Sequence, residues 1–512
     1  MASYLGSVLA PLAVAALCLA ACEKPAPRAK GEPAKPAGPP FGQMVIEADK
    51  ERPRPPFKFE SDDDYFLDQI QLGAFRYFWD AANPKTGMIP DRSSSTVVSV
   101  AGVGFQLAAY AIGAERGWVD GKLARERVEL ILMSLIENPE NRHFGLFYHF
   151  IDGDTAGQPK DAPERVVSTI DTALLFGGLA VAASYFDGSV PKLANQLMAE
   201  ADWTQFVGDG TDDAQGNGYI SLGWKPTDPA QPKGEGKRLP YYWVDSGDEH
   251  RLVTFFAVAA PDPKHRIPAE TYFRLRRQIG SHGDTGPMVW FPWSGSLFVQ
   301  FFAHCFMDHA AMGPDDPSKF NIPNRPKVDW WENARRTARL HQIKAIENPM
   351  KLPGFGEKMW GLSASDNEKG YQVPHLYPTM LPMPGALPNL DYSPFTPKDD
   401  WGDGTVAVYS AGSTIMFDPN PALMALRNYR EIKDVKGQPM KTWRDPATGG
   451  HGFVDSFNVG TGWVSPDDLA IDQGPLMLAI ENARTGFIWR LFHRHDMVKA
   501  GLKTLGMTHP GE

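Results

Sequence analysis

The feature that most constrains this chain is a helical pattern that runs through nearly all of it. From Ser61 onward, apolar residues recur at helical spacing in about twelve segments, while alternating, strand-like runs are few. In residues 62–82, for example, Phe66, Ile70 and Phe78 share one face. A helical solenoid is the rival architecture, but it requires a sequence repeat, and none is visible. Pairs of helices with long loops gathered on one side therefore predict an all-α (α/α)6 toroid. The other predicted helices are 98–118, 120–138, 168–186, 191–207, 247–260, 268–279, 296–311, 329–347, 405–415, 421–432 and 472–494.

The N-terminal segment is typical of an exported lipoprotein. Residues 5–21 are apolar but too short to span a membrane, and they end in Leu19-Ala20-Ala21-Cys22, which resembles a bacterial lipoprotein box with Cys22 as the lipidated residue. An ordinary cleaved signal with an incidental Cys is the alternative. Residues 23–56 are rich in Pro, as in an extended tether. We predict a signal peptide over 1–21, a lipidated N-terminus and linker over 22–60, and a folded domain over 61–500. The predicted location is the periplasm or outer membrane of a Gram-negative bacterium, with membrane contact through the lipid anchor only.

Charge and motifs exclude several classes of function. The 51 basic and 61 acidic residues give a net charge of −10, so no basic face for nucleic acid is expected. With three Cys, two of them in the N-terminal segment, a disulfide framework is excluded. The chain has no GxSxG elbow, P-loop or dinucleotide-binding motif, and Gly102-Val103-Gly104 lies in a helical pattern that favours close helix packing. We expect a monomer without metal or cofactor.

Aromatic residues lie beside carboxylates in the loops. Tyr242 and Trp243 precede Asp245, and comparable pairs recur around Trp293, Trp360 and Trp401. A sugar ring offers an apolar face to an aromatic plane and hydroxyls to carboxylates, so this mixture favours a carbohydrate ligand. The alternative interpretation is that these aromatics seal loops against the core.

Two acids are the strongest candidates for glycosidic chemistry, which needs one carboxyl to protonate the leaving oxygen and another to act on water or the sugar. Asp171 lies in a strongly apolar helix, where ionisation is costly unless the carboxylate is paired. Glu249 begins another predicted helix, where it could also serve only the helix dipole. His304 and Asp308 are four residues apart and are expected on one helical face, without a matching second pair for a metal.

Several motifs together resemble the bacterial glycoamylase-like proteins, including the endo-β-1,2-glucanases of glycoside hydrolase family 144. They run in order over nearly the whole folded part of the chain. The matching segments are 75–80 (FRYFWD), 91–93 (DRS), 145–152 (GLFYHFID), 168–174 (STIDTAL), 291–295 (FPWSG) with His304 and Asp308, 360–366 (WGLSASD), 403–405 (DGT), 471–475 (IDQGP), 480–482 (IEN) and 484–486 (RTG).

The resemblance implies an (α/α)6 toroid that hydrolyses β-linked glucan, with β-1,2-glucan or its oligosaccharides as the best-known substrate class, by a metal-free, inverting mechanism. Glu249 and Asp171 match acids of the family. Relatives usually carry a Glu where this chain has Val166, so Glu164 or Asp161 would have to supply that carboxyl. The expected substrate-binding residues are Asp91, Arg92, Tyr148, His149, Asp152, Tyr242, Trp243, Trp293, His304, Asp308, Trp360, Asp366, Asp403, Asp472, Gln473 and Glu481.

Two alternatives stay open. A non-catalytic glycan-binding lipoprotein could keep the toroid and its aromatics after the loss of one acid, and Val166 is the residue that supports this alternative. A polysaccharide lyase on a similar toroid would need a Tyr or His base and basic residues for uronates, which the acidic balance disfavours.

Overall fold

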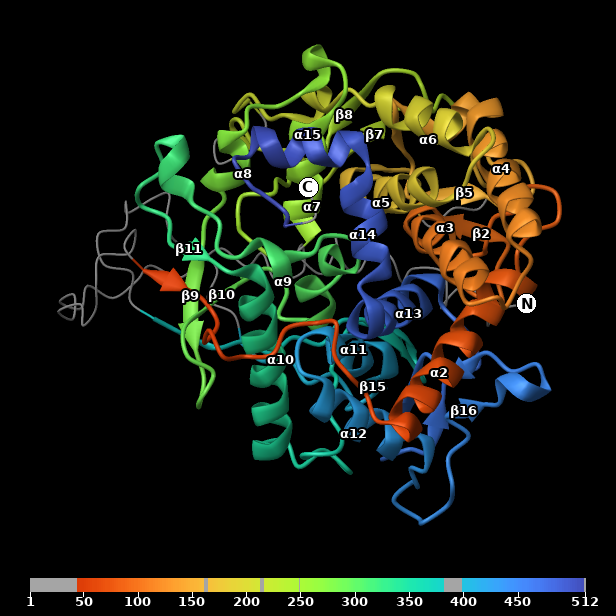
Figure 1. The fold of residues 1–512 in the computed structure, drawn as a ribbon, viewed down its shortest axis with the longest axis vertical. Coiled ribbons are helices and arrows are strands. Elements are labelled where there is room, and N and C mark those ends of the chain that lie inside the picture. Colours follow the sequence, from red (N-terminus) through yellow and green to blue (C-terminus); the bar gives the residue numbers. More distant parts are fainter. Residues whose placement is uncertain (1–43, 161–163, 212–215, 248, 382–397, 511–512) are drawn as a thin grey trace.

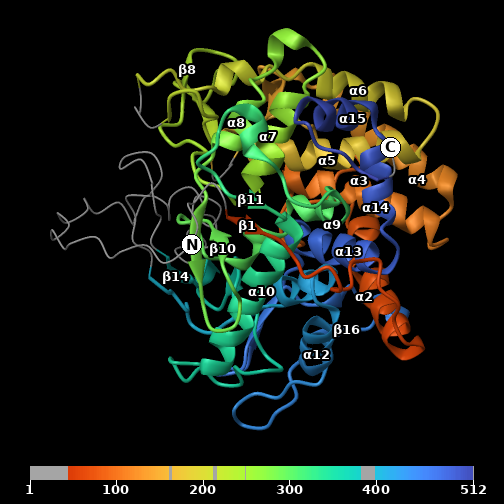
Figure 2. The same ribbon diagram turned by 60° about the vertical axis from the view of Figure 1, so that its left-hand side comes forward.

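The computed structural model describes residues 44–160, 164–211, 216–247, 249–381 and 398–510. The predicted signal peptide, the lipidation site Cys22 and the catalytic candidate Asp161 lie outside these residues. Within the described residues, no helix combines the length and the apolar composition needed to cross a membrane. Figure 1 shows helices arranged as a ring, and Figure 2 shows the same ring turned by 60°.

The ring has an inner and an outer layer, as an (α/α)6 toroid requires, and the predicted fold class is confirmed. The inner helices are buried nearly all round, which is the property of helices enclosed by other helices. They are α3 (Val100–Glu115), α5 (Thr169–Tyr185), α7 (Glu249–Ala259), α11 (Val408–Ser413) and α13 (Ala470–Thr485). The outer layer is formed by α2 (Ser61–Asp80), α4 (Gly121–Glu137), α6 (Val190–Ala199), α8 (Glu270–Arg274), α10 (Trp330–Glu347) and α12 (Pro419–Arg430).

Between α7 and α11 the inner layer is built from 3-10 turns. These turns, η6 (Leu297–Gln300) and η7 (Ala303–Cys305), contact α10, α7 and α13. The predicted helix 296–311 is therefore wrong: the segment breaks into η6, η7 and the short helix α9 (His309–Met312). All residues from Leu297 to Phe306 are buried, and the Phe298 N–H donates to Ser363 Oγ at 3.1 Å, so contacts made across the ring take precedence over helical spacing.

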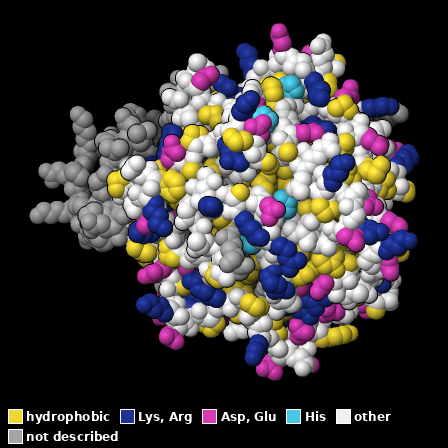
Figure 3. Space-filling model, turned by 45° about the horizontal axis from the view of Figure 1, so that its top comes forward, with side chains coloured by type: hydrophobic (Ala, Val, Ile, Leu, Met, Phe, Trp, Pro, Cys, Tyr) yellow, Lys and Arg dark blue, Asp and Glu magenta, His cyan; other side chains and the backbone are white. Residues whose placement is uncertain are grey.

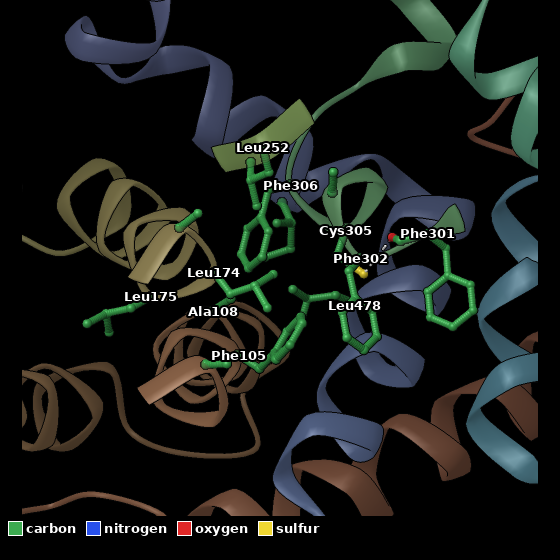
Figure 4. Packing of buried hydrophobic residues seen from close by; sticks show 14 of the residues in the cluster. Phe105, Ala108, Leu174, Leu175, Leu252, Phe301, Phe302, Cys305, Phe306 and Leu478 are labelled. Carbon is green, nitrogen blue, oxygen red and sulfur yellow. Dashed lines mark hydrogen bonds between the residues drawn. The ribbon is translucent and has the colours of Figure 1, made fainter. Parts of the chain in front are cut away.

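Apolar side chains from the inner layer pack against one another in a buried cluster (Figure 4). Phe105 of α3 stacks on Phe306 at 5.6 Å between ring centroids, and Leu252 of α7 and Leu478 of α13 close the same cluster. Gly104 of α3 brings two helices into backbone contact, because a Cβ there would meet the Leu174 carbonyl of α5. The prediction that Gly102-Val103-Gly104 serves close helix packing is confirmed.

Short strands tie the loops together and form no large sheet in the described residues. The paired strands are β1 (Val45–Ile46) with β11 (Lys327–Val328); β2 (Val97–Ser99) with β5 (Phe150–Asp152); β3 (Arg142–His143) with β4 (Leu146–Phe147); β6 (Val167–Ser168), β7 (Gly223–Pro226) and β8 (Gly236–Arg238); β9 (Gln278–Ser281) with β10 (Met288–Trp290) and β14 (Thr379–Met380); β12 (Ser365–Asn367) with β13 (Gly370–Gln372); β15 (Val406–Ala407), β18 (Ser456–Asn458) and β19 (Trp463–Val464); and β16 (Trp443–Arg444) with β17 (Gly452–Phe453).

Further boundaries differ from the sequence prediction. The predicted helix 191–207 ends at Ala199, and the 3-10 turn η3 (Trp203–Phe206) follows it. The end of the predicted linker packs on the domain, since Ile46 is buried in the parallel β1–β11 pair and Arg54 bonds to Asp329 at 2.5 Å. The predicted helix 268–279 ends at Arg274, where the chain turns into β9. The predicted helix 472–494 divides at Gly486 into α13 and α14 (Phe487–Arg494), because Gly486 takes the left-handed conformation that ends helices. The final helix α15 (Asp496–Thr504) packs on α7.

Candidate active site

A cavity opens at the N-terminal ends of the inner helices. Its empty volume, counted out to the mouth, is about 790 Å³. Each inner segment contributes residues from its start: Ser99 directly precedes α3, Asp171 lies in the first turn of α5, and Glu249 is the first residue of α7. The later segments do the same through η6, α11 and α13. The cavity residues are Asp91, Arg92, Ser99, His149, Phe150, Ile170, Asp171, Leu174, Glu249, Phe298, Phe302, Ala364, Tyr371, Tyr409, Leu469, Ile471 and Asp472.

The structure brings the two main catalytic candidates to one cavity. Asp171 and Glu249 lie in the first turns of neighbouring inner helices, α5 and α7, and both residues line the cavity. Asp171 Oδ2 accepts a hydrogen bond of 2.5 Å from Ser168 Oγ, the residue that caps α5. Burial raises the pKa of Asp171, while the charge of His149 and the Ser168 hydrogen bond oppose that rise. The arrangement provides two carboxyls around one ligand position.

His149 links Asp171 to a second acid. Its Nδ1 lies 2.5 Å from Glu164 Oε1, and its Nε2 lies 3.4 Å from Asp171 Oδ1. Burial alone would lower the pKa of His149, but Asp171, Glu164 and Asp91 outweigh it and raise the pKa to about 9. At neutral pH the ring is thus a cation held between two carboxylates. Glu164 contacts the ring and is not among the residues that line the cavity. It lies two residues before Val166, whose backbone carbonyl accepts a hydrogen bond from the backbone N–H of His149.

Opposite charges also meet at Arg92. Its guanidinium donates to Asp366 Oδ2 at 2.8 Å and lies 3.7 Å from Asp91 Oδ2. Burial acts to lower the pKa of Arg92, and the two carboxylates reverse that effect and raise it. Burial raises the pKa of Asp91, and burial together with Asp455 raises the pKa of Asp366 to about 6. Of these groups, Asp91 and Arg92 line the cavity and can hydrogen-bond sugar hydroxyls there, whereas Asp366 supports Arg92 from outside the lining.

Three residues at or behind this wall were not predicted from the sequence. Tyr371 and Tyr409 line the cavity, and burial raises the pKa of both hydroxyls, so they remain neutral donors and acceptors. Asp455 is buried behind Asp472, in the short connection between β17 and β18. Its neighbours Asp-Ser-Phe-Asn carry no helical period, and no signal in the sequence singled this residue out.

The predicted sugar-stacking indoles lie elsewhere. Trp243 and Trp360 are buried, and Trp243 donates through Nε1 to Thr169 Oγ1 at the start of α5. Trp293 donates through Nε1 to Asp245 Oδ2 at 2.7 Å, and Tyr242 packs against Gly216. None of these four lines the cavity, whose described aromatic residues are Phe and Tyr. The interpretation that they seal loops to the core is the one the geometry supports, because indoles this large stabilise more by burial than by exposure.

Other predicted binding residues have structural partners away from the cavity. His304 is buried, with Nε2 3.2 Å from the Trp330 carbonyl, and Asp308 caps α9, so the two do not share one helical face. Glu481 is buried against Arg116 at 2.7 Å. The remaining residues of this kind are Tyr148, which donates to the Pro232 carbonyl; Asp152, which accepts from Thr155; Asp403, which accepts from Thr405; and Gln473, which donates to the Phe453 carbonyl.

Figure 3 shows basic and acidic side chains interspersed over one face of the molecule. Among the described residues, no group of three or more His, Cys, Asp or Glu could hold a metal ion.

The chain matches known proteins over most of its length. The family model "Glycoamylase: Putative glucoamylase" matches residues 240–496, half of the chain. An exo β-1,2-glucooligosaccharide sophorohydrolase acting at the non-reducing end, from Parabacteroides distasonis, is 27% identical over 86% of this chain. This chain spans 58% of the length of that curated relative.

Solved structures agree on the fold. A protein of Bacteroides uniformis with the same family description has a TM-score of 0.70 at 26% identity, covering 89% of this chain and all of that one. An endo-β-1,2-glucanase from Chitinophaga pinensis, in complex with sophorotriose and glucose, has a TM-score of 0.68 at 22% identity, covering 88% of this chain and 99% of that one. Family match, toroid and cavity are consistent with one another, and the chain belongs to the glycoamylase family.

Proposed function

We propose that this protein is a glycoside hydrolase that cleaves β-1,2-linked glucan or its oligosaccharides. The observation that carries the proposal is that Glu249 and Asp171 line one cavity from the first turns of adjacent inner helices. A relative that is named as a sophorohydrolase and a structural neighbour that is named as an endo-β-1,2-glucanase support the linkage.

In the proposed reaction Glu249 gives its proton to the glycosidic oxygen while a water molecule attacks the anomeric carbon. Asp171 takes the proton of that water, so the glycosidic C–O bond breaks as the new C–O bond forms. Burial raises the pKa of Asp171, which makes its ionised form a stronger proton acceptor. Inversion requires carboxyls about 6.5–9.5 Å apart, with room for the water between them.

His149 is proposed to hold Asp171 in place for this step. The imidazolium contacts Asp171 on one side and Glu164 on the other, so Glu164 acts through the ring. Glu164 in this position offsets the loss of the family carboxyl at Val166.

The test is incubation of the purified protein with β-1,2-glucan, sophorooligosaccharides and a panel of other glucans. Reducing ends are counted over time, and the anomers of the first products are followed by NMR. Glu249→Gln should abolish cleavage while Glu270→Gln, an exposed acid at the start of α8, leaves it unchanged. A wild-type protein that cleaves nothing but is retarded in a glucan-containing affinity gel would show instead that the toroid only binds glycan.

We further propose that the protein is exported and anchored by lipid on Cys22. The support is the Leu-Ala-Ala-Cys sequence after an apolar run and the Pro-rich stretch that follows. Metabolic labelling with a fatty-acid analogue should mark the wild type and not Cys22→Ser.

A further inference from the structure

Asp455 is a fully buried acid that the proposed reaction does not use. It is 2% exposed and lies in the connection between β17 and β18. Its Oδ2 accepts hydrogen bonds from Ser456 Oγ at 2.8 Å and from the Asp366 N–H at 3.3 Å. Its Oδ1 has no ordinary donor among the described residues, and the same is true of Oδ2 of Asp472, which is 4% exposed.

Each of these two oxygens could serve as the hydrogen-bond partner of the other. Gln473 Nε2 donates to the Phe453 carbonyl at 2.9 Å, which brings the start of α13 against the β17–β18 connection, and there Asp455 and Asp472 act on each other's pKa through a side-chain hydrogen bond. Two carboxylates offer only acceptors, so this contact is repulsive unless one of them carries a proton. Burial raises the pKa of both carboxyls, and for Asp472 the charge of Asp455 adds to the rise.

The charged and titratable groups around Asp455 and Asp472 favour, on balance, a proton on one of these two carboxyls. Asp91 and Asp366 add negative charge on the cavity side, which favours protonation of Asp472. The Arg92 guanidinium acts in the opposite direction on Asp455, but it is already engaged by two carboxylates. Tyr371 and Tyr409 face the same acids as neutral hydroxyls.

We propose that Asp455 and Asp472 share one proton, and that Asp455 is a positioning residue which holds Asp472 at the cavity wall. The shared proton joins the start of α13 to the β17–β18 connection. Ser456 Oγ, which donates to Asp455, also lies 2.7 Å from the Asp366 carbonyl, so the same bridge joins β12 to β18. Asp472 then presents its remaining oxygen to a sugar hydroxyl without adding another full charge beside Asp91 and Asp366.

Two substitutions separate this role from a catalytic or a merely structural one. In Asp455→Asn the amide N–H replaces the shared proton, so kcat on β-1,2-glucan should stay within about threefold of wild type. In Asp455→Ala the bridge is lost, and kcat should fall about tenfold or more. A loss in Asp455→Asn as large as that in Asp455→Ala would overturn the proposal, because it would mean that the carboxylate itself is needed.

The activity readout rests on the proposed function, and a second readout does not. A carboxyl whose pKa is raised in the folded state stabilises the fold fully below the ordinary aspartate value of 3.8, and this contribution is lost as pH rises through the folded pKa. As pH rises above 3.8, the melting temperature of the wild type should therefore decline more steeply than that of Asp455→Asn. Asp62→Asn, which replaces an exposed acid of α2, is the control and should show the same dependence of melting temperature on pH as the wild type. Equal slopes for wild type and Asp455→Asn would refute the shared proton even if the protein cleaved no glucan.

Discussion

The position of His149 between Glu164 and Asp171 allows a quantitative prediction for Glu164→Gln. The pKa of the His149 ring is raised from its ordinary value of 6.5 to about 9 in the folded protein. A raised histidine pKa stabilises the fold fully below pH 6.5, and the contribution is lost as pH rises through about 9. The folded and ordinary pKa values of His149 differ by roughly 2.5 units. At about 1.36 kcal/mol per unit, this difference corresponds to about 3 kcal/mol of folding stability that is lost as pH rises.

Glu164→Gln removes one of the two carboxylates that contact the ring and leaves Asp171 in place. The pKa of His149 should fall back towards 6.5, and the stability lost between pH 6 and 9.5 should shrink to about half of the wild-type value. Guanidinium chloride unfolding at several pH values measures the loss, and proton NMR of the His149 ring measures the pKa. Glu140→Gln, at an exposed acid, is the control and should leave both quantities unchanged.

The reasoning would be refuted if His149 titrated near its ordinary value in the wild-type protein. It would also be refuted if Glu164→Gln kept the full dependence of stability on pH, since Glu164 would then have no electrostatic influence on the ring.

Two further predictions concern the scaffold. Gly104→Ala should destabilise the fold by about 1–3 kcal/mol in thermal unfolding, because the new methyl group meets the α5 backbone. Gly121→Ala in α4 is the control: the space around Gly121 is open, so this change should be neutral or stabilise the fold by up to about 1 kcal/mol. Glu481→Gln should lower the free energy of unfolding by about 2–5 kcal/mol, because Arg116 loses its buried carboxylate partner. The KM for β-1,2-glucan should stay unchanged, and a raised KM would contradict the placement of Glu481 away from the cavity.

The helical ring could be predicted because its signal is local and periodic. The long outer helices α2, α4 and α10 end within about two residues of the predicted bounds, as amphipathic spacing and capping residues allow. The 3-10 segment from Leu297 to Cys305 could not be predicted, since its apolar spacing is compatible with a helix and only packing inside the ring decides against it.

The site was predictable in part for the same reason. Asp171 and Glu249 could be identified as acids at the starts of apolar helices, which is where the cavity opens. Asp455 has no such signal, because it lies in a short connection whose position depends on pairing between distant strands. The sequence could not place the indoles of Trp243 and Trp360, because an aromatic residue beside a carboxylate gives the same pattern whether it binds sugar or seals a loop.

The closed ring has a mechanical consequence. Helix α13 packs against both α2 and α3, so the last inner helix of the ring meets the first helices of the described chain and closes the array. A linear stack of helices can fray from either end, one unit at a time. Here the loosening of any inner helix breaks contacts with neighbours on two sides and takes away part of the cavity wall, so the scaffold and its pocket fail together.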